Sequence, residues 1–71
     1  MYNIRFEYYD GTAIDCKDVN VVKRIGYNEE YSGERILTSY YPVSEDYWIQ
    51  SSNASYSICC KNLKSILITK A

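Results

Sequence analysis

The sequence contains no histidine, one proline and only three glycines among its 71 residues. Without histidine, the chain lacks the commonest general base and the commonest ligand of transition metals. The glycines, Gly11, Gly26 and Gly33, are too far apart to form a glycine-rich phosphate loop. These absences exclude histidine-based catalytic triads, histidine metal sites and phosphate-loop nucleotide binding.

The sequence also lacks any long hydrophobic run. No apolar stretch reaches the roughly 18–20 residues that cross a bilayer. Met1 leads into the mixed sequence Tyr-Asn-Ile-Arg-Phe-Glu, without the basic start and the apolar core of a signal peptide. We therefore predict a cytoplasmic protein with no membrane segment, whose mature form is this chain.

The three cysteines form neither a disulfide framework nor a zinc motif. They are Cys16 and the adjacent pair Cys59 and Cys60, with no Cys-x-x-Cys spacing. Neighbouring residues of a strand point to opposite faces, so a bridge within the pair would need strained backbone. We predict reduced thiols, with Cys16 and Cys60 buried and Cys59 facing the other way, and no metal or other cofactor.

What the chain does have is the composition of one small globular domain, residues 1–71, with 46% hydrophobic and 24% charged residues. No 11-residue window has helical periodicity, whereas several short stretches alternate apolar and polar residues. The predicted class is all-β, with about seven short antiparallel strands. These strands are expected at residues 2–8, 13–17, 19–27, 36–41, 47–51, 56–60 and 65–70.

The first hairpin can be predicted together with its register. An Asp-Gly pair follows the first strand and indicates a tight turn. A two-residue loop would place Ile14 and Cys16 on the polar face of that strand, whereas a three-residue loop (9–11) pairs Ile14 with Phe6. The longer loop also pairs Cys16 with Ile4. Because burial fixes the register, we predict the three-residue loop, with its glycine in the left-handed conformation.

Two segments of the chain resemble each other: residues 13–19 (AIDCKDV) and residues 57–63 (SICCKNL). We interpret the match as an internal duplication, with repeats 2–27 and 46–70 joined by an acidic connector, 28–45. Each repeat would form a three-stranded meander. The two meanders would pack as a sandwich or close into a small barrel.

Both copies are expected to turn sharply after their shared lysine. Asp18 and Asn62 occupy equivalent positions, and either side chain can hydrogen bond to nearby backbone and set a corner. The residues that follow, Val19 and Leu63, are then expected to enter the core.

The last strand, residues 65–70, has aliphatic side chains on both faces and only Lys64 and Lys70 beside them. As an exposed edge it would promote aggregation. We therefore predict that it is central, or closes a barrel against the first repeat, or pairs across a homodimer axis. Closure within one chain is preferred, and the amides of Ile66 to Ile68 should then exchange slowly.

Tyrosine and acidic residues are the distinctive content of the chain. Residues 28–46 hold five acidic residues against Arg35, a net charge of −4, whereas the other residues sum to +3. Tyrosine suits half-buried strands, and four of the nine fit core or rim positions: Tyr2, Tyr8, Tyr47 and Tyr56. Several others are harder to place inside, because adjacent aromatic residues of a strand cannot both face inward. Exposed aromatics beside an acidic segment are typical of binding surfaces. The predicted partner-binding residues are Tyr31, Tyr40, Tyr41, Trp48, Glu29 and Glu30.

No catalytic residue can be nominated, because the carboxylates are scattered and Cys16 has no histidine to activate it. We predict a non-enzymatic protein-binding module, monomeric or homodimeric. The alternative is a single-stranded nucleic-acid-binding barrel, with bases stacked on aromatic residues among the basic ones. A pI near 5.2 disfavours nucleic acid as the partner. The basic residues of this alternative are Lys23, Arg24, Lys61 and Lys64.

Three sequence stretches are shared with a known group of proteins. They are the alternating start Tyr-x-Ile-x-Phe-x-Tyr, the Tyr-Asp-Gly-Thr hairpin and the closing Lys-Asn-Leu-Lys-Ser-Ile-Leu-Ile-Thr. Through them the chain resembles small uncharacterised β-rich proteins of prophages and conjugative elements in Gram-positive bacteria. The resemblance implies an accessory role in a mobile element, in which the chain interferes with or adapts a host or element protein.

Overall fold

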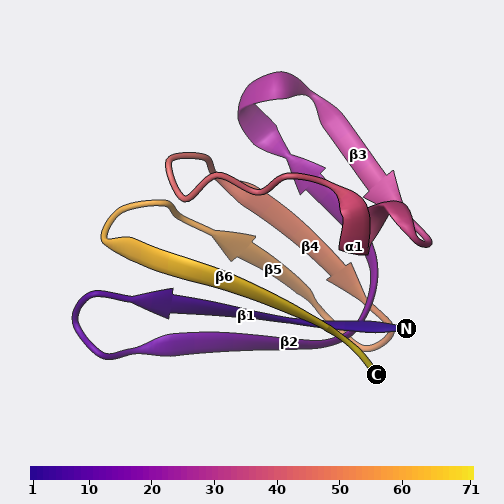
Figure 1. Cartoon of the computed structure of the whole chain (residues 1–71), viewed down its shortest axis with the longest axis horizontal. Helices are drawn as coiled ribbons and strands as arrows, with labels where there is room; N and C mark the ends of the chain where they lie inside the picture. The colour runs from indigo at the N-terminus through magenta and orange to yellow at the C-terminus, as the bar shows by residue number, and fades with distance from the viewer.

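The computed structural model describes all residues, 1–71, and contains one antiparallel sheet of six strands (Figure 1). The all-β class is therefore confirmed, with one strand fewer than expected. Two short helical turns interrupt the strands. The elements are β1 (Tyr2–Tyr8), β2 (Ala13–Arg24), η1 (Ile25–Tyr27), β3 (Glu29–Ser32), α1 (Arg35–Thr38), β4 (Tyr47–Ser51), β5 (Ser55–Ile58) and β6 (Leu63–Lys70).

The hairpin of β1 and β2 has the predicted register. Ile4 pairs with Cys16 and Phe6 pairs with Ile14, as predicted. The N–H of Tyr8 donates to the carbonyl of Thr12 at 2.9 Å and closes a three-residue loop. Gly11 has φ 90°, a left-handed conformation that costs a residue with a side chain about 1 kcal/mol. Alternation and turn chemistry therefore suffice to define this part of the fold.

The structure corrects the expected corner at Asp18. The chain continues as one twelve-residue strand, β2, and the predicted strand at 19–27 is its second half followed by the turn η1. Asp18 has φ 54° and lies at a bulge where the pairing with β1 shifts register. Its N–H donates to Asn3 Oδ1 at 3.1 Å. The bulge bends β2, so that its first half pairs with β1 and its second half lies between β3 and β4.

The second predicted meander is also different. Asn62 is left-handed, with φ 63°, and Leu63 is buried as expected. However, β6 pairs with neither β4 nor β5. It pairs with β1, and Ile68 lies opposite Ile4. The N–H of Tyr9 donates to the carbonyl of Asn62 at 2.9 Å. This hydrogen bond joins the loop between β1 and β2 to the turn between β5 and β6.

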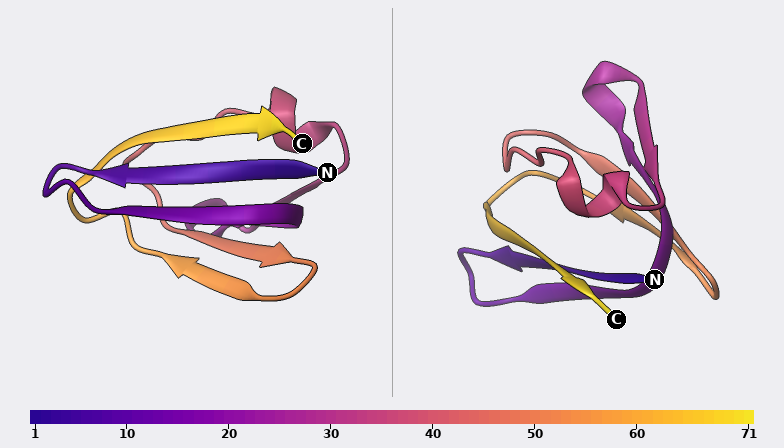
Figure 2. Two further views of the ribbon diagram at one scale, coloured as in Figure 1. Left: turned by 90° about the horizontal axis from the view of Figure 1, so that it is seen from below. Right: turned by 45° about the vertical axis from the view of Figure 1, so that its right-hand side comes forward.

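The sheet is strongly curled but open. Its order is β5-β4-β2-β1-β6, and β3 pairs with the second half of β2. Figure 2 shows the strands following one another in this order around a bent sheet, with β6 and β5 at the two ends. The prediction that the last strand is central or closes a barrel is therefore wrong, because β6 is an edge strand.

The inner face of the curled sheet encloses one hydrophobic core. Alternate residues of the strands supply most of it, as the pleat requires. Phe6 and Tyr47 pack with their ring centroids 6.1 Å apart. The twelve core residues are Tyr2, Ile4, Phe6, Cys16, Val19, Val22, Tyr31, Ile36, Tyr47, Ile49, Ile58 and Leu63.

The predicted strand at residues 36–41 is replaced by a helical turn and a loop. Gly33, at φ 60°, reverses the chain ahead of α1, and Ile36 alone of this helix is buried. The hydroxyls of Thr38 and Ser39 donate to backbone carbonyls four residues earlier and close the turn. No sheet neighbour is available to this segment, so Pro42 does not end a strand.

Candidate protein-binding surface

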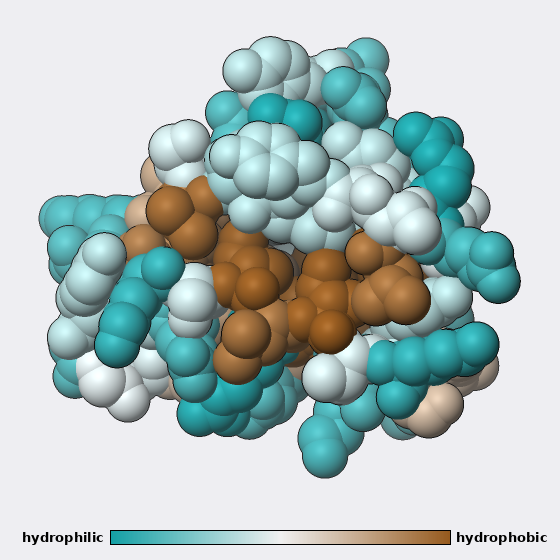
Figure 3. Space-filling model, in the orientation of Figure 1, coloured by the Kyte–Doolittle hydropathy of each residue, from teal (hydrophilic) through white to brown (hydrophobic).

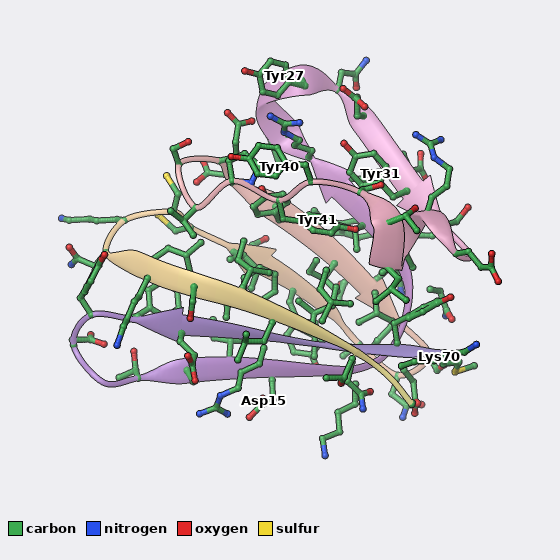
Figure 4. All side chains as sticks on the ribbon, viewed as in Figure 1. Asp15, Tyr27, Tyr31, Tyr40, Tyr41 and Lys70 are labelled. Carbon is green, nitrogen blue, oxygen red and sulfur yellow. The ribbon has the colours of Figure 1, made fainter.

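Two of the predicted binding residues are part of the core. Tyr31 is only 4% exposed, and Tyr41 is half-buried beside it (Figure 4). The ring centroids of Tyr31 and Tyr41 are 5.7 Å apart, as are those of Tyr41 and Tyr47, and both pairs meet edge to face. The sequence placed Tyr31 and Tyr41 on a binding surface, and this is corrected by their packing.

Two tyrosine hydroxyls hold the path of the connector, one by a hydrogen bond within the connector and one by a hydrogen bond from β4. Tyr41 donates to the carbonyl of Ile36 at 2.7 Å, and Tyr47 donates to the carbonyl of Pro42 at 2.7 Å. Burial raises the pKa of both phenols well above the ordinary value, so both remain protonated donors. These two contacts fix the connector on either side of Tyr40.

Most of the large apolar side chains that are exposed lie in the connector or in η1, just before it. Five of the eight large apolar side chains left exposed belong to residues 25–43, so exposure is concentrated in one part of the chain. Tyr40 is 74% exposed and Tyr27 is 57% exposed, and Figure 4 shows both on the same upper part of the molecule. We call this set the connector surface: Ile25, Tyr27, Leu37, Tyr40 and Val43.

A half-buried ion pair supports Tyr27. Arg24 Nε lies 3.3 Å from Glu45 Oε1, and only 15% and 17% of the two side chains are exposed. The guanidinium lies 4.0 Å from the centroid of the Tyr27 ring. A Cβ at Gly26 would come within 2.9 Å of the same glutamate oxygen, so a glycine fits this turn. The contact holds the exposed ring in place.

Sequence reasoning missed the exposed members Ile25, Tyr27, Leu37 and Val43. It placed residues 19–27 in a strand, whereas Asn28 is left-handed, with φ 53°, and ends η1. The Gly-Tyr-Asn sequence at residues 26–28 was an available turn signal. The exposure of Leu37 and Val43 depends on the path of the connector, and no pattern in the neighbouring sequence predicts it.

Trp48 and Glu30 lie on a different face, the outer side of the sheet. One cross-strand row contains Glu30 of β3, Lys23 of β2, Trp48 of β4 and Ser57 of β5. The Lys23 Nζ lies 5.3 Å from the centroid of the Trp48 ring. Trp48 is half-buried, and its neighbours along β4 point to the core. The row brings two predicted site residues together, but away from Tyr40.

The remaining predicted residue, Glu29, lies at the start of β3 and is exposed. Its carboxylate accepts a hydrogen bond from the Tyr31 hydroxyl at 3.2 Å. Glu29 and Glu30 therefore point to opposite sides of β3. The six residues named from the sequence form no single patch.

Asp46 lines a groove beside Trp48. This carboxylate accepts a hydrogen bond from the N–H of Cys60 at 2.9 Å, which lowers its pKa. The N–H of Ile25 donates to the Asp46 carbonyl at 3.1 Å, so Asp46 joins η1 to the turn after β5. The groove is lined by Ile25, Asp46, Tyr47, Trp48, Ser57, Ile58 and Cys59.

All three cysteines are free thiols. Cys16 is buried and Cys59 is exposed, as predicted, whereas Cys60 is only half-buried. Burial raises the pKa of Cys16 to about 11. No three cysteine or carboxylate side chains converge in a way that would hold a metal ion.

The basic residues of the nucleic-acid alternative are dispersed. Arg24 is paired with Glu45, and Lys23 lies over Trp48. Lys61 follows β5, and Lys64 lies near the start of β6. A further basic side chain, Arg5, is engaged by two carboxylates on the outer face of β1.

Neither helical turn has the length and hydrophobicity that a membrane-spanning helix requires. No protein-family model matches the sequence, no curated protein is significantly similar to it, and no solved structure has a significantly similar fold.

Proposed function

We propose that this chain is a non-enzymatic protein-binding module that contacts its partner through the connector surface. The observation that carries the proposal is the presentation of Tyr40. Tyr40 is 74% exposed, and the connector around it is held by the Tyr41 hydrogen bond to Ile36 within the connector and by the Tyr47 hydrogen bond from β4 to Pro42. A rigidly presented tyrosine supplies a large contact area at a small cost in conformational entropy.

Charge supports the same surface. Of the five acidic residues between 28 and 46, only Glu45 is in an ion pair. Among the others, Glu29 and Glu34 are exposed connector residues, and their negative field would accelerate encounter with a basic protein surface. The partner class is therefore a protein with a basic patch. We also propose, as the resemblance implies, that the chain has an accessory role in a mobile element and acts in the cytoplasm.

The test is affinity capture from a lysate of a Gram-positive bacterium, with three forms of the chain as bait. The variant Tyr27→Ser/Tyr40→Ser removes both exposed rings without touching the buried tyrosines. The control, Tyr9→Ser, removes a ring from the loop between β1 and β2, where the residue is 73% exposed. Proteins retained by the wild type and the control, but lost from the double variant, would support the proposal. Equal capture by all three would contradict it.

A single observation favours the nucleic-acid alternative: Lys23 lies over the half-exposed ring of Trp48. Such a pair can stack a base and contact a phosphate. Trp48 is the only tryptophan, so its fluorescence reports on this face alone. Quenching by a single-stranded oligonucleotide that weakens steeply with salt, and is lost in Lys23→Ser, would establish this alternative. Unchanged fluorescence would exclude stacking on Trp48.

A further inference from the structure

The two ends of the sheet differ in how well they are protected. β5 is a four-residue edge with exposed serines at positions 55 and 57. β6 is an eight-residue edge that contains no proline and carries Ile66, Leu67 and Ile68 in its middle. Short, polar edges discourage further pairing, whereas long apolar edges invite it. Figure 2 shows β6 as the outermost strand beside β1.

The direction of the free backbone groups follows from one hydrogen bond. The N–H of Ala71 donates to the carbonyl of Met1 at 2.9 Å, so these two residues form a hydrogen-bonded pair. Such pairs alternate with non-bonded pairs along antiparallel strands. Leu67 therefore directs its N–H and carbonyl toward β1. Ile66 and Ile68 direct theirs away from β1, along the open edge.

The side chains around this edge are apolar. Leu67 is 50% exposed on the outer face, whereas Ile66 and Ile68 are half-buried on the inner face. Figure 3 shows an apolar band across the side of the molecule on which β6 lies. The helical turn α1 also contacts β6, and Figure 1 shows α1 beside the C-terminal end of the strand.

The charges at the edge argue against self-pairing. Lys64 and Lys70 flank the apolar stretch, and β6 contains no acidic residue. In a two-fold antiparallel pair centred on Leu67, Lys64 of one copy would face Lys70 of the other. Like charges directly opposite each other destabilise a strand pair. A segment with acidic residues at its ends would instead complement both lysines.

We propose that the edge of β6 is a second interaction surface, which adds an extended segment of another protein as a strand, apolar at alternate positions and acidic at both ends. The backbone of Ile66 and Ile68 supplies the hydrogen bonds of this added strand. Lys64 and Lys70 select its end charges. This proposal does not depend on the connector surface, although α1, which carries Leu37, contacts β6.

The test uses a fluorescent seven-residue peptide with glutamate at both ends, valine at positions 3 and 5, and threonine at the positions between. Its two glutamates are six residues apart and on one face, as are Lys64 and Lys70. Binding is followed by fluorescence anisotropy and by amide hydrogen exchange of the protein. We expect the peptide to slow exchange at Ile66 and Ile68. A peptide with lysine ends should bind at least about fivefold more weakly, because two exposed ion pairs become repulsive. A central proline in the peptide should abolish binding.

The matched variants separate edge recognition from general charge attraction. Lys64→Glu/Lys70→Glu should reverse the preference between the two peptides. Lys17→Glu/Lys23→Glu, with the same net charge, should leave it unchanged. Absence of peptide binding, equal binding of both peptides, or no slowing at Ile66 and Ile68 would overturn the proposal. Slow exchange there without peptide, together with a doubled sedimentation mass, would assign the edge to a second copy and also overturn it.

Discussion

At the scale of single residues, the tyrosines divide by the hydrogen bond that each hydroxyl makes. Tyr41 and Tyr47 donate to connector carbonyls from half-buried or buried positions, whereas Tyr40 has no partner within the chain. Replacing either buried tyrosine by phenylalanine leaves a carbonyl unpaired. We expect Tyr41→Phe and Tyr47→Phe each to lower the free energy of unfolding by about 1 kcal/mol in urea denaturation. Tyr40→Phe is the control and should leave it unchanged.

The buried thiol makes stability depend on pH in the alkaline range. Burial raises the pKa of Cys16 from 9.0 to about 11, so between these values the unfolded chain loses a proton that the folded chain keeps. Stability from this group is complete below pH 9 and is lost as pH rises toward 11. We expect a loss of about 1 kcal/mol by pH 10, measured by urea denaturation under reducing conditions.

The cysteine variants identify the source of this dependence. Cys16→Ala should remove most of the slope between pH 8 and 9.5, whatever it does to stability at pH 7. Closer to pH 10 some slope remains, because the raised pKa values of Tyr41 and Tyr47 act in the same direction. Cys59→Ala removes an exposed thiol and should preserve the slope. An unchanged slope between pH 8 and 9.5 in Cys16→Ala would mean that another group is responsible.

The sequence predicted that one of the adjacent Tyr40 and Tyr41 faces outward because it placed both in a strand. Tyr40 is exposed, but the segment is a loop after α1, so strand alternation is not the reason. Tyr31 was misplaced, because its segment was interpreted as part of the acidic connector, whereas it forms β3 and directs that ring into the core. A single apolar residue among polar ones gives no periodicity from which burial could be inferred.

At the scale of elements, the bend of β2 depends on one residue. Asp18 occupies a left-handed conformation that aspartate tolerates, glycine adopts freely and a β-branched residue resists. We expect Asp18→Val to lower the free energy of unfolding by about 1–2 kcal/mol. Asp18→Gly should leave it within about 0.5 kcal/mol of the wild type, because relief of strain offsets the added freedom of the unfolded chain.

Asn20 provides the matched control, since it is exposed on the same strand and has no positive φ. Valine favours extended strands, so Asn20→Val should be neutral or slightly stabilising. Thermal and urea denaturation of the three variants would measure the contrast. Equal effects of valine at both positions would show that the bulge conformation is not the cause.

Element prediction worked best where two independent signals agreed. In the first hairpin, the alternation of both strands and the turn residues allow one register, and that register forms. The segment from Ile36 to Tyr41 has apolar residues at both odd and even positions, so its pattern does not distinguish a strand from a turn. Its conformation depends on burial of Ile36 and on the Tyr41 hydroxyl bond, which are tertiary contacts.

At the scale of the whole molecule, the position of β6 could not be predicted from local pattern. Its aliphatic residues predicted a strand with a lysine on each side, and β6 is such a strand. Its neighbour is β1, from the other end of the sequence, and no local signal distinguishes this pairing from a meander with β5. The curled sheet surrounds the core from β5 to β6. The connector completes the core with Ile36 of α1 and with Tyr41, which packs against it.

The open edge makes a prediction that distinguishes this sheet from a closed barrel. In the free chain, the amide of Leu67 points to β1 and should exchange slowly, as should that of Thr69, which has the same parity. The amides of Ile66 and Ile68 point to the open edge and should exchange much faster. Residue-resolved hydrogen exchange by NMR at low protein concentration would measure this alternation. In a closed barrel, all four amides would be hydrogen bonded and uniformly slow. Uniform protection in a particle of 8.3 kDa would therefore contradict the open sheet.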